Sequence, residues 1–295
     1  MNRARKYRDA TLGYVLTAPL VLWILLLKLY PLTHTFLLSF RDQRLIGGEA
    51  PFVGMKLYHK LIFRDPEIWI ALRNSVTWVL GNVLIQLVVG ILLAILLQQK
   101  FAFRSGVRTW LMIPWFTPAV VLSIMWKWIL SPTTGVINDI LLSLNVIKEP
   151  IVFFSGANAM KTLIGIHSWR YIPFVAVVVL ARLITIPREL YEAAMVDGAS
   201  STQQLRFITI PHIKGVVTSL GLLATIWTLN TFDIIWITTS GGPGTATLTL
   251  PVVVFLRGFK AFRLSEAAVL SVLMFFMALV IMILFFRFQK HEAEE

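Results

Sequence analysis

The chain of 295 residues contains no cysteine and unusually few charged residues. Without cysteine it has no disulfide, thiolate metal site or cysteine nucleophile. Charged residues make up 14% of the sequence, whereas a typical soluble domain has about 25%. Hydrophobic residues reach 57%, above the roughly 45–50% of soluble proteins. This composition predicts an integral membrane protein.

The sequence also lacks the spacings that metal and nucleotide sites require. No H-E-x-x-H or comparable metal motif occurs, and the five histidines are far apart. We therefore interpret each of them as a loop or interface residue; they are His34, His59, His167, His212 and His291. No G-x-x-x-x-G-K-[ST] phosphate loop is present, so we expect no cofactor in this chain.

Basic residues outnumber acidic ones, giving a net charge of +12. They are scattered along the chain rather than gathered in one segment. A surface facing anionic membrane lipid explains this pattern better than a nucleic-acid partner. We therefore expect contact with lipid and none with nucleic acid.

Six apolar segments are long enough to cross a bilayer, which takes roughly 20 helical residues. The sequence thus predicts an all-α polytopic membrane protein with six transmembrane helices. The predicted spans are Leu12–Leu38, Ile68–Leu97, Val107–Leu130, Thr162–Leu183, Gly215–Ile237 and Ala267–Phe288.

The distribution of basic residues predicts which side each loop faces. Lysines and arginines are about equally numerous on the two sides, but the N-terminal side has the shorter basic connections, with Arg104 and Arg108 beside a span. The positive-inside rule gives most weight to such short loops. We therefore expect a cytoplasmic N-terminus, a cytoplasmic C-terminus after six spans, and a cytoplasmic loop between the fourth and fifth spans.

That fourth loop is the most polar part of the chain and reads as a helical hairpin. It carries Arg188, Glu189, Glu192, Asp197 and Arg206. Each such charge costs roughly 2.5–3.5 kcal/mol at the centre of a bilayer on insertion scales, so the loop must lie outside the hydrocarbon.

Its turn residues divide the loop into two helices. Pro187 suits the first turn of a helix, and Gly198 can adopt the left-handed conformation that ends it. Ser201 followed by Gln204 predicts a capping box for a second helix, which Pro211 is expected to end. These features by themselves also allow a simple connecting loop.

The spacing in this loop matches a known signature. Glu-Ala-Ala, three residues, Gly, nine residues, Ile, one residue and Leu-Pro is typical of the membrane subunits of binding-protein-dependent ABC importers. Glu192-Ala193-Ala194, Gly198, Ile208 and Ile210-Pro211 follow it, with Ile210 in place of Leu as the one departure. The whole chain resembles the sugar and glycerol-phosphate permeases of this family. Further matching motifs are Phe52-Val53-Gly54, Ala71-Leu72-Arg73-Asn74, Trp126 with Gly135 and Asn138, and Gly241-Gly242-Pro243.

The resemblance implies a function for the hairpin. In this family the loop is a coupling helix that sits in a cleft of a separate ATPase subunit, where ATP and Mg²⁺ are bound. It implies that this chain is no enzyme itself. Carried over to this chain, the coupling residues are Glu192, Ala193, Ala194, Asp197, Gly198 and Ala199.

The resemblance also implies an assembly and a location. The expected partners are two ATPase subunits, a second permease that we expect to be a different chain, and an extracytoplasmic solute-binding protein. The expected location is the bacterial inner membrane. We expect one transmembrane domain over 1–295, with a cytoplasmic N-terminus at 1–11, a membrane core at 12–290 containing the coupling loop 186–212, and a cytoplasmic tail at 291–295.

Polar and aromatic residues in the fourth and fifth spans are candidates for the solute path. Intramembrane polar residues are functional candidates by default, and a sugar favours an aromatic platform beside hydroxyls and amides. Similarity to maltose-type permeases supports the same region. The candidates are Arg170, Tyr171, Phe174, Ala224, Trp227, Thr228, Asn230 and Thr231.

Other interpretations remain open at this level. Arg170 can instead pair with Asp233, and the threonines can serve packing alone. An ion-coupled secondary transporter would need carboxylates in relay or paired broken helices, yet Asp233 is the one plausible intramembrane acid. A membrane enzyme would need catalytic groups gathered in one cavity, whereas the carboxylates lie mainly in the hairpin and loops.

Overall fold

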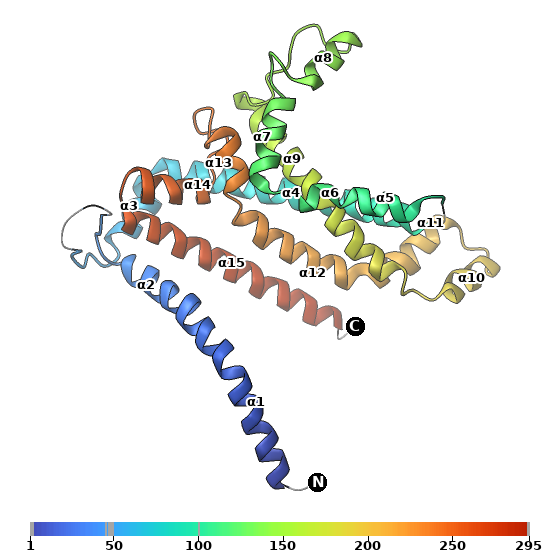
Figure 1. Ribbon diagram of the computed structural model, residues 1–295, viewed down its shortest axis with the longest axis horizontal. Helices are drawn as coiled ribbons and strands as arrows, with labels where there is room; N and C mark the ends of the chain where they lie inside the picture. Colours follow the sequence, from blue (N-terminus) through green and yellow to red (C-terminus); the bar gives the residue numbers. More distant parts are fainter. Residues whose placement is uncertain (1–2, 45, 47–49, 100, 294–295) are drawn as a thin grey trace. The chain divides into compact units, whose positions relative to one another are not determined.

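A computed structural model describes residues 3–44, 46, 50–99 and 101–293. Figure 1 shows helices joined by loops, and the described residues contain no β-strand beyond an isolated bridge between Arg41 and Phe52. The predicted all-α class is therefore confirmed. The chain divides into two compact units, one formed by 1–65 with 254–276 and the other by 66–253 with 277–295.

Helices of the first unit come from both ends of the chain. They are α1 (Arg3–Ile24), the π-helical turn η1 (Leu25–Leu29), α2 (Tyr30–Leu38), α3 (Lys56–Arg64), the last part of α14 (Leu250–Phe255), η3 (Leu256–Lys260) and the start of α15 (Leu264–Ala293). Ser39 Oγ lies 2.7 Å from the Tyr58 hydroxyl, and Ser265 Oγ donates to the Leu38 carbonyl at 3.1 Å. These bonds join α2, α3 and α15 at one end of the first span.

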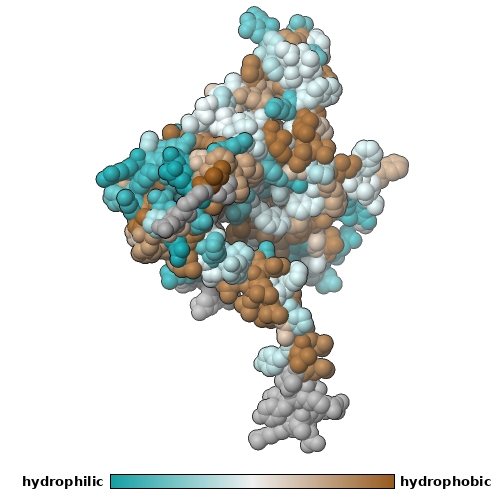
Figure 2. Space-filling model, turned by 60° about the vertical axis from the view of Figure 1, so that its left-hand side comes forward, coloured by the Kyte–Doolittle hydropathy of each residue, from teal (hydrophilic) through white to brown (hydrophobic). Residues whose placement is uncertain are grey.

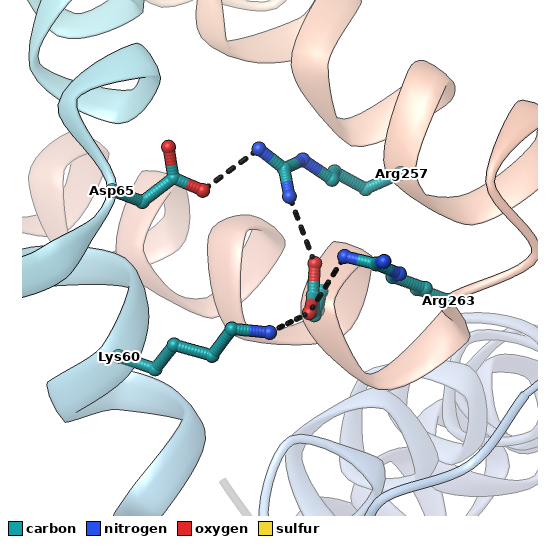
Figure 3. A network of polar contacts seen from close by, with 5 residues as sticks. Lys60, Asp65, Arg257 and Arg263 are labelled. Atoms are coloured by element: carbon teal, nitrogen blue, oxygen red, sulfur yellow. Dashed lines mark hydrogen bonds and ion pairs between the residues drawn. The ribbon is translucent and has the colours of Figure 1, made fainter.

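An ion network joins α3 to the η3–α15 turn within the same unit (Figure 3). Lys60 Nζ lies 2.7 Å from Glu266 Oε1, and Arg257 lies 3.2 Å from Glu266 Oε2 and 2.7 Å from Asp65 Oδ2. Arg263 adds a contact of 3.5 Å to Glu266. The Glu266 side chain is only 6% exposed. The three cations around it compensate the charge of this buried carboxylate.

The second unit is built on three long helices that pack together, α4 (Pro66–Gln98), α9 (Gly156–Leu183) and α12 (Ile210–Leu229). Shorter helices lie between them: α5 (Arg104–Leu111), α6 (Ile113–Phe116), α7 (Ala119–Ile129), α8 (Val136–Ser143), α10 (Arg188–Val196), α11 (Ser201–Gln204), η2 (Leu205–Thr209) and α13 (Asp233–Thr239). Helices α4 and α9 approach closely at Gly90, where a Cβ would lie 2.5 Å from Val175. Small residues permit such contacts between membrane helices.

Apolar side chains cover much of the surface, as a membrane environment requires. Exposed leucines and valines recur every four residues along α4, at Leu80, Leu84, Val88, Leu92 and Leu96. This spacing places them on one face of the helix. Figure 2 shows further hydrophobic patches at the surface. In water these faces would be an aggregation hazard, whereas lipid chains solvate them.

Five of the predicted spans correspond to long apolar helices, at Leu12–Leu38, Pro66–Gln98, Gly156–Leu183, Ser201–Leu229 and Leu264–Arg287. The third predicted span, Val107–Leu130, is not one continuous helix. Arg104–Phe116 and Ala119–Ile129 form a pair bent by 96°. Thr117 is extended (φ −70°, ψ 125°) before Pro118, because the proline ring disfavours a helical conformation in the preceding residue. The pair still counts as a sixth span if it crosses the membrane as one unit.

The fifth span also differs from the prediction at both ends. It begins at Ser201 and ends at Leu229, so Asn230–Phe232 separate it from α13. We had predicted that Pro211 ends a helix. It lies instead in the first turn of α12. The π-helical turn at Leu205–Thr209 precedes it, with the Ile210 N–H donating to the Leu205 carbonyl. The wider turn carries the helix into the proline without a break.

Candidate functional site

The polar hairpin between α9 and α12 consists of two short helices joined by a glycine turn. Helix α10 ends at Val196, and Gly198 takes a positive φ of 79°. The Ala199 N–H then donates to the Ala194 carbonyl at 2.8 Å. The predicted order of helix, glycine turn and helix is confirmed.

The second helix of the hairpin is capped one residue earlier than predicted. Ser200, not Ser201, is the N-cap, and its partner in the capping box is Gln203, not Gln204. The Ser200 N–H donates to Gln203 Oε1 at 2.7 Å, and the Gln203 N–H donates to Ser200 Oγ at 3.3 Å. Two consecutive Ser–Gln pairs made both registers compatible with the sequence, and the one nearer the glycine turn forms.

The hairpin is fixed to the helix core at its base. Tyr191 and Ile208, one from each arm, pack against a buried cluster that includes Leu183 and Ile213 together with Leu97 of α4. The Tyr191 hydroxyl also lies 3.0 Å from Thr209 Oγ1. A force applied to the hairpin therefore reaches α4, α9 and α12 directly.

The tip of the hairpin is exposed and partly apolar. Glu192, Ala193, Asp197 and Gly198 are exposed, and Ala194 and Ala199 are half-buried. Val196 is 88% exposed and Met195 58%. An apolar tip with a flanking carboxylate is suited to a protein cleft rather than to water alone. The sequence analysis had not singled out Met195 and Val196.

Aromatic side chains of three segments gather between α6, α9 and α12. Trp115 stacks on Phe174 with ring centroids 4.5 Å apart and lies 5.0 Å from Tyr171 and 5.9 Å from Trp227. Phe174 and Tyr171 lie 5.7 and 6.2 Å from Trp227. We call Trp115, Tyr171, Phe174 and Trp227 the aromatic cluster. Trp227 is 38% exposed, so the cluster is accessible.

Trp115 was missed by sequence reasoning, although the neighbouring prolines signal the bend that turns this segment. The three other members of the cluster are among the eight predicted solute-path residues. Their side chains come from α9 and α12, which the predicted spans had placed in sequence but not side by side.

The remaining predicted solute-path residues have different environments. Thr228 is 1% exposed and Ala224 7%, so both lie in the helix packing in this conformation. Asn230 is exposed and donates to the Ile226 carbonyl at 2.8 Å. Thr231 Oγ1 donates to the Trp227 carbonyl and lies 3.4 Å from His167 Nε2.

Arg170 lies beside the aromatic cluster. Its guanidinium carbon is 5.5 Å from the centroid of the Tyr171 ring, and its buried Nε has no hydrogen-bond partner among the described residues. No ion pair within 4 Å joins it to Asp233 in the described part of the chain, so the alternative pairing does not form here. Asp233 instead accepts from the Ile234 N–H at 2.9 Å.

His167 lies at the interface between α9 and α4, inside the predicted fourth span. It is 1% exposed within α9, not in a loop. Its Nδ1 lies 2.9 Å from Asn82 Oδ1 and 3.2 Å from Gln86 Nε2, both on α4. Its ring lies 4.5 Å from Tyr171 and 4.9 Å from Trp78. His167 thus joins α4 to the base of the aromatic cluster.

Two of the other motifs that resemble those of the permease family contain an asparagine that hydrogen-bonds to a loop. Asn74 Nδ2 donates to the Thr245 and Leu248 carbonyls at 2.8 and 3.0 Å, holding the segment after Gly241-Gly242-Pro243. The Asn138 amide donates to the Ile151 carbonyl at 3.1 Å and accepts from the Ile151 N–H at 2.8 Å. Their positions in the motifs therefore have a structural basis.

Comparison with known proteins agrees with this geometry. Residues 86–292 match the family described as binding-protein-dependent transport system inner membrane component. The chain belongs to this family. It is an importer permease and a multi-pass membrane protein, and the ion-coupled alternative is not favoured.

Curated relatives of this permease match over most of its length. The trehalose/maltose transport system permease protein MalF of Thermococcus litoralis is 32% identical over 251 residues, covering 85% of this chain and 84% of the relative. The sulfoquinovosyl glycerol transport system permease protein SmoG of Agrobacterium fabrum is 33% identical, covering 95% of this chain and 90% of the relative.

A solved structure shares the fold of the permease. The crystal structure of a bacterial ABC transporter involved in the import of the acidic polysaccharide alginate superposes with a TM-score of 0.85 at 23% identity, covering 97% of this chain and 99% of that one. A related crystal structure of a bacterial alginate ABC transporter contains a periplasmic protein with bound alginate pentasaccharide. The family description, a binding-protein-dependent transport system, supports the expectation of a transporter complex that includes a binding protein.

Proposed function

We propose that this permease carries a sugar, as an oligosaccharide or a related glycoside or polyol phosphate, through the membrane by alternating access. The observation that carries the proposal is the aromatic cluster with Arg170 beside it. Aromatic rings match the apolar faces of a sugar, and an arginine whose Nε has no partner among the described residues supplies a donor for its hydroxyl edges. The substrates in the names of the relatives, trehalose, maltose and sulfoquinovosyl glycerol, support this class of solute.

The hairpin is the proposed contact with the ATPase. Glu192, Ala193 and Gly198 present a charge, a small surface and a turn, with the apolar tip at Met195 and Val196 beside them. ATP and Mg²⁺ would bind to two separate ATPase subunits, and this chain would have no enzymatic activity of its own. A second permease completes the pathway. The hairpin and both termini would face the cytoplasm, and 1–295 would act as one transmembrane domain.

Reconstitution tests the energy source. The permease, assembled with its second permease and ATPase subunits in proteoliposomes, is expected to take up labelled sugar only when ATP and the loaded binding protein are both present. Uptake should persist when ionophores collapse proton and sodium gradients. Uptake that needs an ion gradient and no ATP would contradict the proposal.

Removing the Trp227 ring tests the solute path. Trp227→Ala is expected to raise the KM for sugar uptake about ten-fold, since base–aromatic stacking, a comparable platform contact, contributes roughly 1–3 kcal/mol. Trp236→Ala in α13 is the matched control, because Trp236 stacks on Phe232 outside the aromatic cluster. Equal effects of both substitutions on the KM would contradict a role of the aromatic cluster in the solute path.

A further inference from the structure

The first unit carries a basic surface to which the proposed function assigns no role. The segments 41–65 and 257–266 contain eight Lys and Arg against four Asp and Glu. We define the basic face as the exposed cations of these segments; they are Arg41, Arg44, Lys56, Lys60, Arg64, Lys260 and Arg263.

Ion pairs and hydrogen bonds hold the two segments of the basic face together. Lys60 of α3 and Arg263 meet at Glu266 Oε1, at 2.7 and 3.5 Å (Figure 3). Gln43, two residues after the exposed Arg41, accepts from the Ser265 N–H at 3.2 Å and donates its own N–H to Ser265 Oγ at 2.8 Å. The basic face is therefore one surface rather than two separate segments.

The network neutralises two of the four acids in these segments and leaves cations over. Asp65 and Glu266 are engaged by Arg257, Lys60 and Arg263. Lys56, Arg64 and Lys260 form no ion pair with another described residue and are exposed. These three cations thus remain for an anion from outside the chain.

The basic face lies where spans meet the membrane surface. Arg41 follows the end of the first span at Leu38, Arg64 precedes the second at Pro66, and Arg263 precedes the last at Leu264. Each of these cations is at most three residues from a span end, a separation that chain length limits to about 11 Å. In the proposed orientation this is the outer side, where the positive-inside rule predicts few basic residues, so their presence needs another cause.

Exposed aromatic residues accompany the cations. Phe63 on α3 is 73% exposed and Phe259 on η3 is 57% exposed. Lysine and arginine beside exposed phenylalanine are typical of helices that lie in the headgroup region of a membrane. A purely protein-binding acidic partner would not require this closeness to three span ends.

We propose that the basic face binds the phosphate groups of anionic phospholipids. Lys56, Arg64 and Lys260 provide the cations, the network around Glu266 holds α3 and the η3–α15 turn in position, and Phe63 and Phe259 enter the acyl boundary. This site is independent of which solute the permease carries.

The test measures lipid preference in the purified importer complex. Fluorescent phosphatidylglycerol and phosphatidylcholine are compared for binding in detergent micelles. Each Lys or Arg near an anionic surface strengthens binding about five-fold. The triple variant Lys56→Gln, Arg64→Gln, Lys260→Gln is expected to lose about ten-fold or more of the preference for phosphatidylglycerol, with an unchanged melting temperature because none of the three belongs to the ion network.

A matched variant controls for net charge. Lys127→Gln, Lys148→Gln, Lys161→Gln removes the same charge from exposed positions in the second unit and should keep the preference. The proposal is overturned if the first variant retains the preference, or if both variants lose it equally. It is also overturned if the first variant binds phosphatidylglycerol normally but loses affinity for the binding protein in phosphatidylcholine nanodiscs, which would assign the basic face to an acidic protein.

Discussion

Replacing Gly198 by valine is expected to lower ATP-driven uptake about ten-fold. Gly198 has φ +79°, and no atom lies within 4 Å of the position that a Cβ would take. The cost is therefore conformational rather than steric. A left-handed conformation costs an L-residue roughly 1–2 kcal/mol, and 1.4 kcal/mol is a factor of ten in an equilibrium. The turn between α10 and α11 would open, and the hairpin would lose the shape that the ATPase recognises.

The control is the residue that tolerates this conformation. Asparagine visits the left-handed region readily, so Gly198→Asn should keep uptake within about two-fold of the unsubstituted permease. Co-purification of the ATPase subunits with each variant measures association separately from transport. Normal uptake and association for Gly198→Val would show that the glycine turn is not needed for coupling.

Trp78→Ala is expected to have the largest effect on stability. Trp78 is 1% exposed on α4, contacts the ring of His167, and donates its indole N–H to the Thr228 carbonyl at 3.0 Å. Replacing a buried Trp or Phe by alanine typically costs 3–5 kcal/mol. We expect the melting temperature of the detergent-solubilised permease to fall by several degrees. Thermal unfolding monitored by intrinsic fluorescence measures this change.

An exposed tryptophan in another membrane-spanning helix provides the control for Trp78→Ala. Trp23 on α1 is 66% exposed, and Trp23→Ala should change the melting temperature by little. If both substitutions lower it equally, the buried position of Trp78 is not what stabilises the second unit.

The spans and the hairpin were predictable because composition decides both. A run of apolar residues and a cluster of charges are local properties, and the bilayer separates them strongly. The turn at Gly198 was also predictable, since few other residues accept its conformation. The register of the capping box was not, because Ser200-Ser201 and Gln203-Gln204 offer two equivalent pairings.

The buried polar centre could not be read from the sequence. His167 meets Asn82, which lies 85 positions away in the chain, and nothing local marks the two as partners. The bend at Pro118 was missed for a different reason. The hydropathy of Val107–Leu130 is that of a span, and composition does not report the direction of a helix axis. The roles of the coupling and solute-path residues stay predictions until the variants are measured.

The unbroken helix through Pro211 has a mechanical consequence. Ser201–Leu229 is a single element of 29 residues, about 40 Å long at 1.5 Å per residue. It begins at the hairpin tip and ends beside Trp227. A hinge at Pro211 would allow the hairpin to tilt without moving the membrane span. Without one, the helix would act in the proposed assembly as a lever, with its short arm at the ATPase and its long arm at the wall of the solute path.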